Sequence, residues 1–157
     1  LDPHGPVCLC GKRGCVERLA SGPYLAQDAR QALSQEPDQG PELLRLCGGF
    51  YDQITAEMLS RAARQGDPLA SRLLARSAWA IGTAIGNAAN LLNPQRAILG
   101  GGVTKAGRAW WQGVRSAARQ TMLPEVSIEI VPAKLGDDAP LWGAAVLALE
   151  CVANERR

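Results

Sequence analysis

Apolar residues recur at the three- and four-residue spacing of an amphipathic helix over much of this chain. The first such segment begins at Val16 and continues past Pro23, and it gives way to a polar break over residues 35–41. Thr55 is a suitable N-cap for the next helix, which the pattern predicts to continue to Arg64. Most of the first half of the chain is therefore predicted to be helical.

A long helix is predicted next, over about residues 68–92. Asp67 can cap it, and Pro68 suits the first helical turn, where a missing N–H leaves no hydrogen bond unmade. Gly82 and Gly86 lie about one turn apart and leave a strip without side chains. Because glycine destabilises a helix, this strip predicts that another element packs closely against it.

Two short segments have the character of strands. Residues 96–99 are predicted to form a buried strand that ends in a glycine triplet, and residues 126–131 alternate between apolar and polar side chains. Helical segments follow each of them, over residues 107–122 and from about 140 to 152. Helices combined with strands in this order indicate an α/β fold.

Composition and charge narrow the class of protein. The 157 residues are 46% hydrophobic, which is enough to form one core, and no internal repeat or interdomain linker divides them. The chain has 17 basic and 15 acidic residues, and a formal net charge of +2 does not favour binding to nucleic acid or to an anionic membrane. No apolar run reaches the roughly 20 residues of a membrane span, and no signal peptide opens the chain. We expect one domain that contacts neither.

Three of the five cysteines, Cys8, Cys10 and Cys15, lie in the segment CLCGKRGC. Residues two apart in an extended chain point to the same side, and the two glycines of the segment allow the backbone to bring the third sulfur to the same point. A disulfide between the first two would close a small, strained ring. The spacing therefore favours a structural zinc site, and the alternative is three free cysteines on a glycine-rich turn.

A structural zinc ion takes four ligands, so the three cysteines leave one position to fill. His4 is the only histidine and is the candidate that the sequence contains. It lies between Pro3 and Gly5 in a predicted surface turn, where a solvated side chain is the alternative.

The cysteine segment resembles the signature of the ROK family of repressors and sugar kinases, whose best-known members are bacterial glucokinases. The shared pattern is C-x-C-G-x-x-G-C-x-E, which Glu17 completes. Agreement extends to the segments DPHGP (2–6), ASG (20–22), NLLNP (90–94), AILGGGV (97–103) and LWGAA (141–145). The resemblance implies the C-terminal domain of an actin-like, ribonuclease H-like ATPase fold, with a zinc-binding loop at its N-terminal end.

The resemblance further implies that residues 1–157 form the C-terminal domain of a subunit roughly twice this long. In the family, a preceding domain carries an Asp-x-Gly-x-Thr phosphate turn and an aspartate general base, so no catalytic residue is expected in this chain. The zinc histidine of the family belongs to an upstream Glu-x-Gly-His segment. The fourth ligand is thus either His4 or an upstream histidine.

Two further roles follow from the resemblance. A glutamate in the first turn of a helix, such as Glu17, is favoured by the helix dipole alone, but the matching glutamate of the family binds sugar hydroxyls. A strand-to-helix turn explains the triplet Gly100, Gly101 and Gly102 as well as a nucleotide contact does, but the matching turn of the family lines the nucleotide cleft. We expect sugar binding by Glu17 and nucleotide binding by the triplet.

The implied activity is transfer of the γ-phosphate of ATP, bound with Mg²⁺, to the 6-hydroxyl of a hexose, with glucose as the expected acceptor and glycolysis as the setting. Other hexoses, N-acetylated sugars and polyphosphate are alternative substrates. The sugar-sensing domain of a ROK transcriptional repressor and an inactive fragment are alternative identities.

Exposed aromatic residues on helices predict a homodimer or higher homo-oligomer. Cys47 and Cys151 are further unpaired cysteines, and free cysteines favour a cytoplasmic location.

Overall fold

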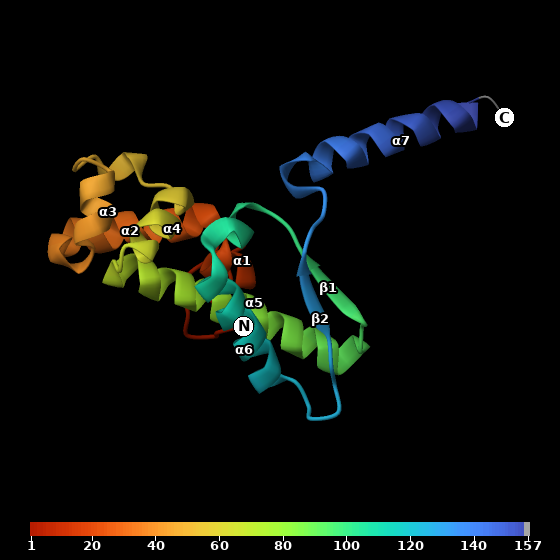
Figure 1. Ribbon diagram of the computed structural model, residues 1–157, viewed down its shortest axis with the longest axis horizontal. Helices are drawn as coiled ribbons and strands as arrows, with labels where there is room; N and C mark the ends of the chain where they lie inside the picture. Colours follow the sequence, from red (N-terminus) through yellow and green to blue (C-terminus); the bar gives the residue numbers. More distant parts are fainter. Residues whose placement is uncertain (156–157) are drawn as a thin grey trace.

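The structure is a computed structural model, and it describes residues 1–155. A long central helix, α5, carries smaller helices around one end and two strands beside the other, while the last helix extends away from the body (Figure 1). The elements in chain order are α1 (Val16–Ala20), α2 (Gly22–Gln35), η1 (Pro37–Gln39), α3 (Pro41–Leu46), η2 (Tyr51–Gln53), α4 (Ala56–Arg64), α5 (Pro68–Leu92), β1 (Arg96–Leu99), η3 (Gly102–Ala106), α6 (Arg108–Thr121), β2 (Glu129–Pro132), η4 (Gly136–Asp138) and α7 (Ala139–Glu155).

The first helical segment is divided, which the apolar pattern did not predict. Ser21 adopts extended backbone angles between α1 and α2. An uninterrupted helix would need a backbone N–H at position 23 to bond the carbonyl of Leu19, and Pro23 has none. The proline instead occupies the first turn of α2, where no such bond is required.

The predicted caps are confirmed. The Thr55 side chain accepts a hydrogen bond from the backbone N–H of Met58 at 3.2 Å at the start of α4. Asp67 caps α5 by accepting from Ala70 N–H at 2.8 Å, and its second oxygen accepts from Leu43 N–H at 2.9 Å. Its side chain is therefore fully paired although it is buried, and it ties α3 to α5.

The glycine strip of α5 is the surface on which α6 packs, as predicted. A Cβ at Gly82 would overlap the carbonyl oxygen of Val114, and one at Gly86 would lie 2.6 Å from the Cβ of Thr121. The core continues from this contact into the helices at the other end of α5. Its largest fully buried side chains include Leu25, Leu33, Leu43, Ile54, Leu59, Leu69 and Val114.

The two strands pair in parallel, with Ala97 opposite Ile130 and Ile98 opposite Val131. β2 is shorter than the predicted strand over 126–131. The prediction that β1 is buried was wrong, since the Ile98 side chain is 65% exposed while Ala97 and Leu99 pack on the core. The reason is that the helices cover one face of this sheet, and nothing in residues 1–155 covers the other.

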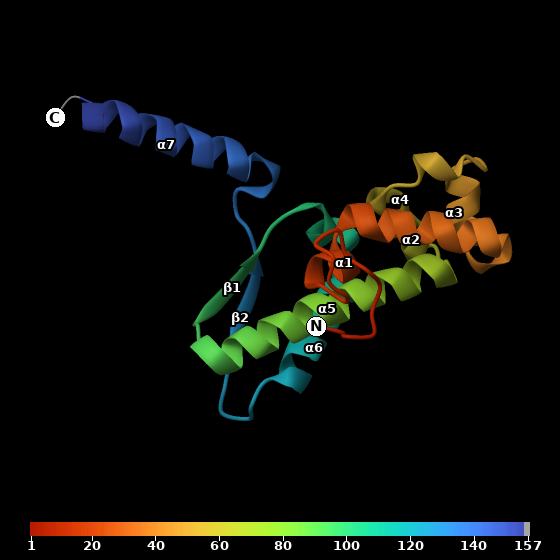
Figure 2. The same ribbon diagram turned by 180° about the vertical axis from the view of Figure 1, so that it is seen from behind.

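The final helix, α7, confirms the predicted helix near the end of the chain. It projects away from the remaining elements in both views (Figures 1 and 2). Its apolar residues are exposed, among them Leu141, Trp142, Leu147 and Leu149. Apolar residues that surround a helix are typical of a helix that is buried in a larger assembly. Over residues 1–155, no helix combines the length and hydropathy that crossing a membrane requires.

Candidate functional site

The three clustered cysteines converge on one point. The sulfur atoms of Cys8, Cys10 and Cys15 all lie within 4.8 Å of one another, and the last two are 3.4 Å apart. Thiolates at about 2.3 Å from a tetrahedral zinc ion would be about 3.8 Å apart, so this spacing suits such an ion. Of the three residues, Cys8 is buried, Cys15 is partly buried and Cys10 is exposed.

Glycine allows the backbone to make this approach. Gly11 and Gly14 have φ angles of 82° and 55°, in the left-handed region that other residues rarely adopt. A Cβ at Gly14 would collide with the carbonyl oxygen of Asp2. Hydrogen bonds close the loop, from Gly11 N–H to Cys8 O at 2.9 Å and from Gly14 N–H to Pro6 O at 3.0 Å. The role predicted for these glycines is confirmed.

His4 does not belong to the cluster that the described residues form. Its residue is exposed, and its backbone N–H donates to Asp2 Oδ1 at 3.0 Å. The structure thus brings together the three predicted sulfur ligands and leaves the histidine candidate outside them.

Two of the clustered thiols have shifted pKa values. A hydrogen bond from the backbone N–H of Cys10 lowers the pKa of the Cys8 thiol. Interaction with the Cys10 side chain, followed by burial, raises the pKa of Cys15 to about 11. Three thiolates this close repel one another unless a positive ion neutralises them, as a bound divalent metal does. The donor set therefore fits zinc.

Glu17 and the glycine triplet, far apart in the sequence, line the same cleft. Its volume is about 280 Å³. Glu17 lies in the first turn of α1 with an exposed side chain, two residues after Cys15, which is the N-cap of that helix. The remaining lining residues are Val16, Ala20, Ser21, Gly22, Ile81, Leu99, Val103, Thr104, Trp110 and the triplet Gly100–Gly102.

Hydrogen bonds fix the backbone on both sides of the cleft. Ser77 of α5 donates its hydroxyl hydrogen to the carbonyl of Ala20 at 3.1 Å, which fixes the end of α1. The turn after β1 is held by Thr104, whose hydroxyl donates to Gly101 O at 2.7 Å. Gly101 has a φ of 94°, so a glycine is required there.

Ser21 is a further residue of this cleft that the sequence analysis did not single out as a ligand. Its hydroxyl oxygen is buried and makes no hydrogen bond within the described structure. A buried hydroxyl without a partner is available to a polar ligand. Ser21 is also the N-cap of α2, so its place in the shared segment ASG did not by itself indicate this role.

A model of the ROK family matches residues 1–151. The chain belongs to the ROK family. It is 36% identical to the glucokinase of Streptomyces coelicolor over 156 residues, which cover 96% of this chain and 48% of that one. It is 28% identical to the transcriptional repressor Mlc of Escherichia coli, over 94% of this chain and 35% of the repressor. It spans about half the length of the glucokinases it matches.

A solved structure agrees with the fold of this ROK chain. The crystal structure of a ROK family glucokinase from Streptomyces griseus, in complex with glucose and AMPPNP, superposes with a TM-score of 0.79 at 35% identity. The match covers 94% of this chain and 48% of that one. ROK sugar kinases of this kind have an actin-like ATPase fold, which confirms the actin-like, mixed α/β part of the prediction made from the sequence.

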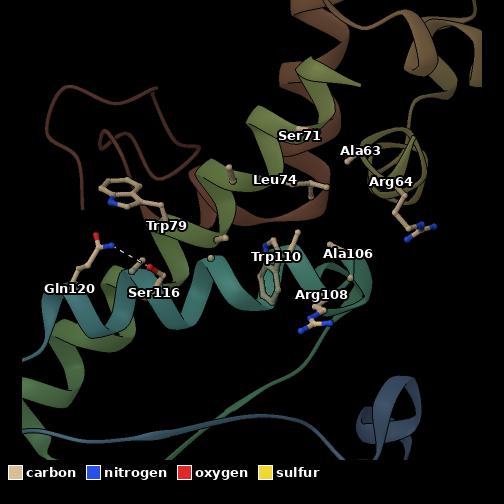
Figure 3. A pocket seen from close by; sticks show the side chains of 16 residues that line it. Ala63, Arg64, Ser71, Leu74, Trp79, Ala106, Arg108, Trp110, Ser116 and Gln120 are labelled. Atoms are coloured by element: carbon tan, nitrogen blue, oxygen red, sulfur yellow. Dashed lines mark hydrogen bonds between the residues drawn. The ribbon is translucent and has the colours of Figure 1, made fainter. Parts of the chain in front are cut away.

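Trp110 also lines a second, larger cavity of the ROK chain, between α4, α5 and α6 (Figure 3). Its volume is about 600 Å³. Trp79 and Gln120 lie at one end, where Gln120 donates to the Ser116 hydroxyl at 3.2 Å, and Arg108 lies at the other. None of the predicted site residues lines it.

Proposed function

We propose that this chain supplies sugar-binding and nucleotide-binding surfaces of a ROK sugar kinase, which transfers the γ-phosphate of ATP to the 6-hydroxyl of glucose. The observation that carries the proposal is the cleft that Glu17 and the Gly100–Gly102 turn line together. The S. griseus glucokinase, which was solved with glucose and AMPPNP, supports both ligands.

The residues of the cleft suit these two ligands. The carboxylate of Glu17 can accept hydrogen bonds from two neighbouring sugar hydroxyls, and the unpaired hydroxyl of Ser21 offers a further polar contact nearby. The three glycines present bare backbone, with open space where side chains would be at Gly101 and Gly102. ATP with its Mg²⁺ can therefore approach the turn closely. Phosphoryl transfer depends mainly on such positioning.

We infer that the chain positions the substrates and does not itself abstract the proton. Residues 1–157 act in this account as the C-terminal domain of the kinase. The aspartate general base that the resemblance implies belongs to the other domain of the family fold. The exposed face of β1 and the exposed apolar residues of α7 support a larger assembly around this domain.

The cysteine loop acts in this proposal as a structural zinc site. Cys8, Cys10 and Cys15 would hold the ion, with a histidine from outside the cluster as the fourth ligand, either His4 or one upstream. Zinc would fix the loop from which α1 begins, and so the position of Glu17. The proposal further includes a cytoplasmic location and a homodimer or higher homo-oligomer, for which the exposed Trp79 and Trp142 provide apolar surface.

A ROK transcriptional repressor is the second candidate, favoured by the match to Mlc over 94% of the chain. A repressor would share the sugar cleft but would not transfer phosphate. The even charge of this segment, with 17 basic and 15 acidic residues, disfavours DNA binding by the segment itself. ATP turnover with glucose in the protein that carries this chain distinguishes the candidates.

The sugar role of Glu17 is tested by Glu17→Gln, with glucose affinity measured by calorimetry. Loss of a charged hydrogen-bond acceptor should weaken glucose binding by roughly tenfold to a hundredfold. Glu57→Gln is the matched control, because Glu57 is exposed in the first turn of α4 and lines neither cavity described above. Equal glucose affinity in Glu17→Gln and Glu57→Gln would contradict the assignment.

A further inference from the structure

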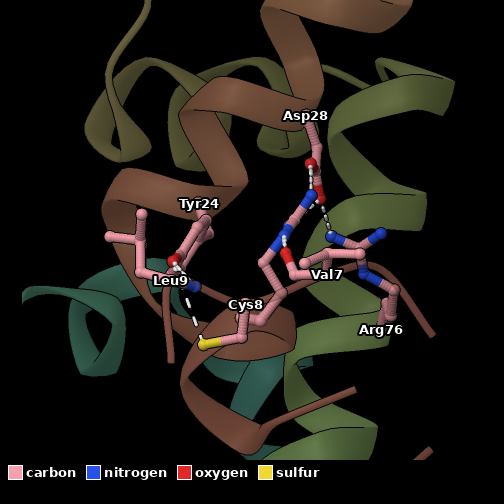
Figure 4. A network of polar contacts seen from close by, with 7 residues as sticks. Val7, Cys8, Leu9, Tyr24, Asp28 and Arg76 are labelled. Carbon is pink, nitrogen blue, oxygen red and sulfur yellow. Dashed lines mark hydrogen bonds and ion pairs between the residues drawn. The ribbon is translucent and has the colours of Figure 1, made fainter. Parts of the chain in front are cut away.

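A largely buried ion-pair network lies beside the segment of the cysteine loop that carries Cys8 (Figure 4). Its centre is Arg18, whose residue is 7% exposed although arginine is rarely buried. The Arg18 guanidinium forms a bidentate pair with Asp28 of α2, at 2.9 Å from Nη1 to Oδ2 and 2.6 Å from Nη2 to Oδ1. Arg76 of α5 pairs with the same carboxylate. The network therefore joins three helices.

Arg18 also holds the backbone on one side of Cys8. Its Nε–H donates to the carbonyl of Val7 at 3.2 Å, which leaves the guanidinium with a partner on each of its edges. Because Asp28 fixes both terminal nitrogens, the direction of the Nε–H is fixed too. The Val7 carbonyl thus accepts a hydrogen bond from a guanidinium group whose orientation is fixed by Asp28 of α2.

Tyr24 holds the backbone on the other side of Cys8. Its hydroxyl oxygen accepts from Leu9 N–H at 3.1 Å and lies 4.0 Å from the Cys8 sulfur. The guanidinium of Arg18 lies 4.7 Å from the centre of the Tyr24 ring, a cation–π distance, so the two side chains support each other. Both peptide groups that flank Cys8 are therefore fixed by side chains of α1 and α2.

These contacts differ from those of a buried ion pair that only stabilises the helices. A purely structural pair would be satisfied by Asp28 and Arg76, without contact to the loop. Here one arm of Arg18 reaches the residue before the first metal ligand. Arg18 is also the residue that follows Glu17 in α1, so its seat on Asp28 fixes the helix that carries the sugar ligand.

We propose that Arg18, seated on Asp28 and Tyr24, is the positioning residue that shapes the cysteine loop before metal binds and anchors the start of α1. The inference rests on the proposed zinc site and sugar role of Glu17, and it deepens both. Groups that orient metal ligands commonly change metal affinity without touching the metal. The expected consequence is a loop that is ordered in the metal-free protein.

Hydrogen exchange of the metal-free protein, followed by NMR for each amide, tests the positioning role without metal. The N–H groups of Cys8 and Leu9 are bonded, to Lys12 O and to Tyr24, and should exchange slowly in the wild type. Arg18→Lys keeps the positive charge but loses the planar guanidinium that bonds Asp28 and Val7 O together. It should raise the exchange rates of both amides at least tenfold. Tyr24→Phe, which removes only the hydroxyl, should raise that of Leu9 most.

Arg30→Lys is the matched control, because Arg30 lies on the same helix, α2, and donates to the carbonyl of Ile54 at 2.8 Å, away from the loop. It should leave the exchange of Cys8 and Leu9 unchanged. Rapid exchange of these amides in the wild type, or equal rates in Arg18→Lys and Arg30→Lys, would overturn the positioning role.

Metal binding gives a second readout, with Co²⁺ as a spectroscopic probe of thiolate coordination and Zn²⁺ by competition. Arg18→Lys should weaken Zn²⁺ binding by roughly tenfold to a hundredfold, and Arg30→Lys should not. Equal Zn²⁺ affinities in the two variants would overturn the link from Arg18 to the metal. If the wild-type protein with Co²⁺ shows no cobalt–thiolate absorption band, the zinc site itself is wrong. The amide exchange rates of Cys8 and Leu9 would then still test whether Arg18 shapes the loop.

Discussion

The cysteine loop and helix α7 differ in how far the rest of the chain fixes them through contacts. The loop has little regular structure, yet side chains and glycine turns fix its backbone groups, and Arg18 and Tyr24 secure the peptides around Cys8. Helix α7 is long and regular, yet its side chains, such as Leu147 and Leu149, are exposed. In this chain, therefore, an irregular loop has its backbone fixed by side chains, while a regular helix has exposed apolar side chains, and the candidate metal site lies in the loop.

The largest expected effect is that of Asp28→Asn, which leaves two arginines around a neutral group in a largely buried place. Removing one partner of a buried ion pair should lower the free energy of unfolding by about 3–5 kcal/mol. Glu129→Gln breaks the exposed pair with Arg96, where both side chains are more than half exposed, and should cost less than about 1 kcal/mol. Urea unfolding compares the two variants, and equal costs would show that the Asp28 network is not specially stabilising.

A second comparison uses matched leucines from the core and from α7. Leu33→Ala empties a fully buried site and should cost about 2–5 kcal/mol. Leu147→Ala changes a side chain that is 63% exposed and should alter stability by less than about 0.5 kcal/mol. Thermal unfolding of the 157-residue chain by itself measures both, and a large loss for Leu147→Ala there would mean that α7 packs on the chain's own core.

Two helix glycines extend the comparison between the packed core and the exposed helix α7. Gly82→Ala introduces a Cβ against the carbonyl of Val114 and should destabilise the protein by about 1–3 kcal/mol. Gly143→Ala, in α7, meets no atom within 4 Å and should stabilise the helix by about 0.5–1 kcal/mol. Opposite signs in chemical denaturation are expected. Stabilisation by both substitutions would contradict the close packing of α5 on α6.

The smallest expected effect is a pH dependence from Asp28. Burial alone would raise the pKa of its carboxyl, but hydrogen bonds from Arg18 and Arg76 outweigh it and hold the pKa below the ordinary 3.8. The resulting stability is present above the unfolded pKa and is lost as the pH falls through the folded pKa. The stability of the wild type should decline below about pH 4 more steeply than that of Asp28→Asn. Parallel acid-unfolding curves would rule out this contribution.

Features that depend on residues close together in the sequence could be predicted from it. Thr55 and Asp67 could be predicted as caps because each lies one residue before a helical segment. Gly82 and Gly86 predicted a close contact because glycine inside a helix is otherwise unfavourable. The cysteine spacing predicted converging sulfurs because the loop between them is short and contains glycine.

Features that depend on distant partners could not be predicted. The exposure of Ile98 depends on which elements cover the sheet, and a strand-like run of apolar residues contains no such information. The meeting of Glu17 with the glycine turn was not predicted, because α2 to α5 and β1 lie between them in the sequence. The network of Arg18, Asp28 and Arg76 gave no signal, since three charged residues on helices usually face solvent.

The central claim is that the cysteine loop and the sugar cleft form one unit, joined through α1. Its most direct test is the affinity of glucose for the protein that carries this chain, measured with zinc bound, after removal of zinc by a chelator, and after zinc is restored. We expect glucose binding to weaken at least tenfold without zinc and to recover when zinc returns. Glucose affinity that is the same in all three states would contradict it.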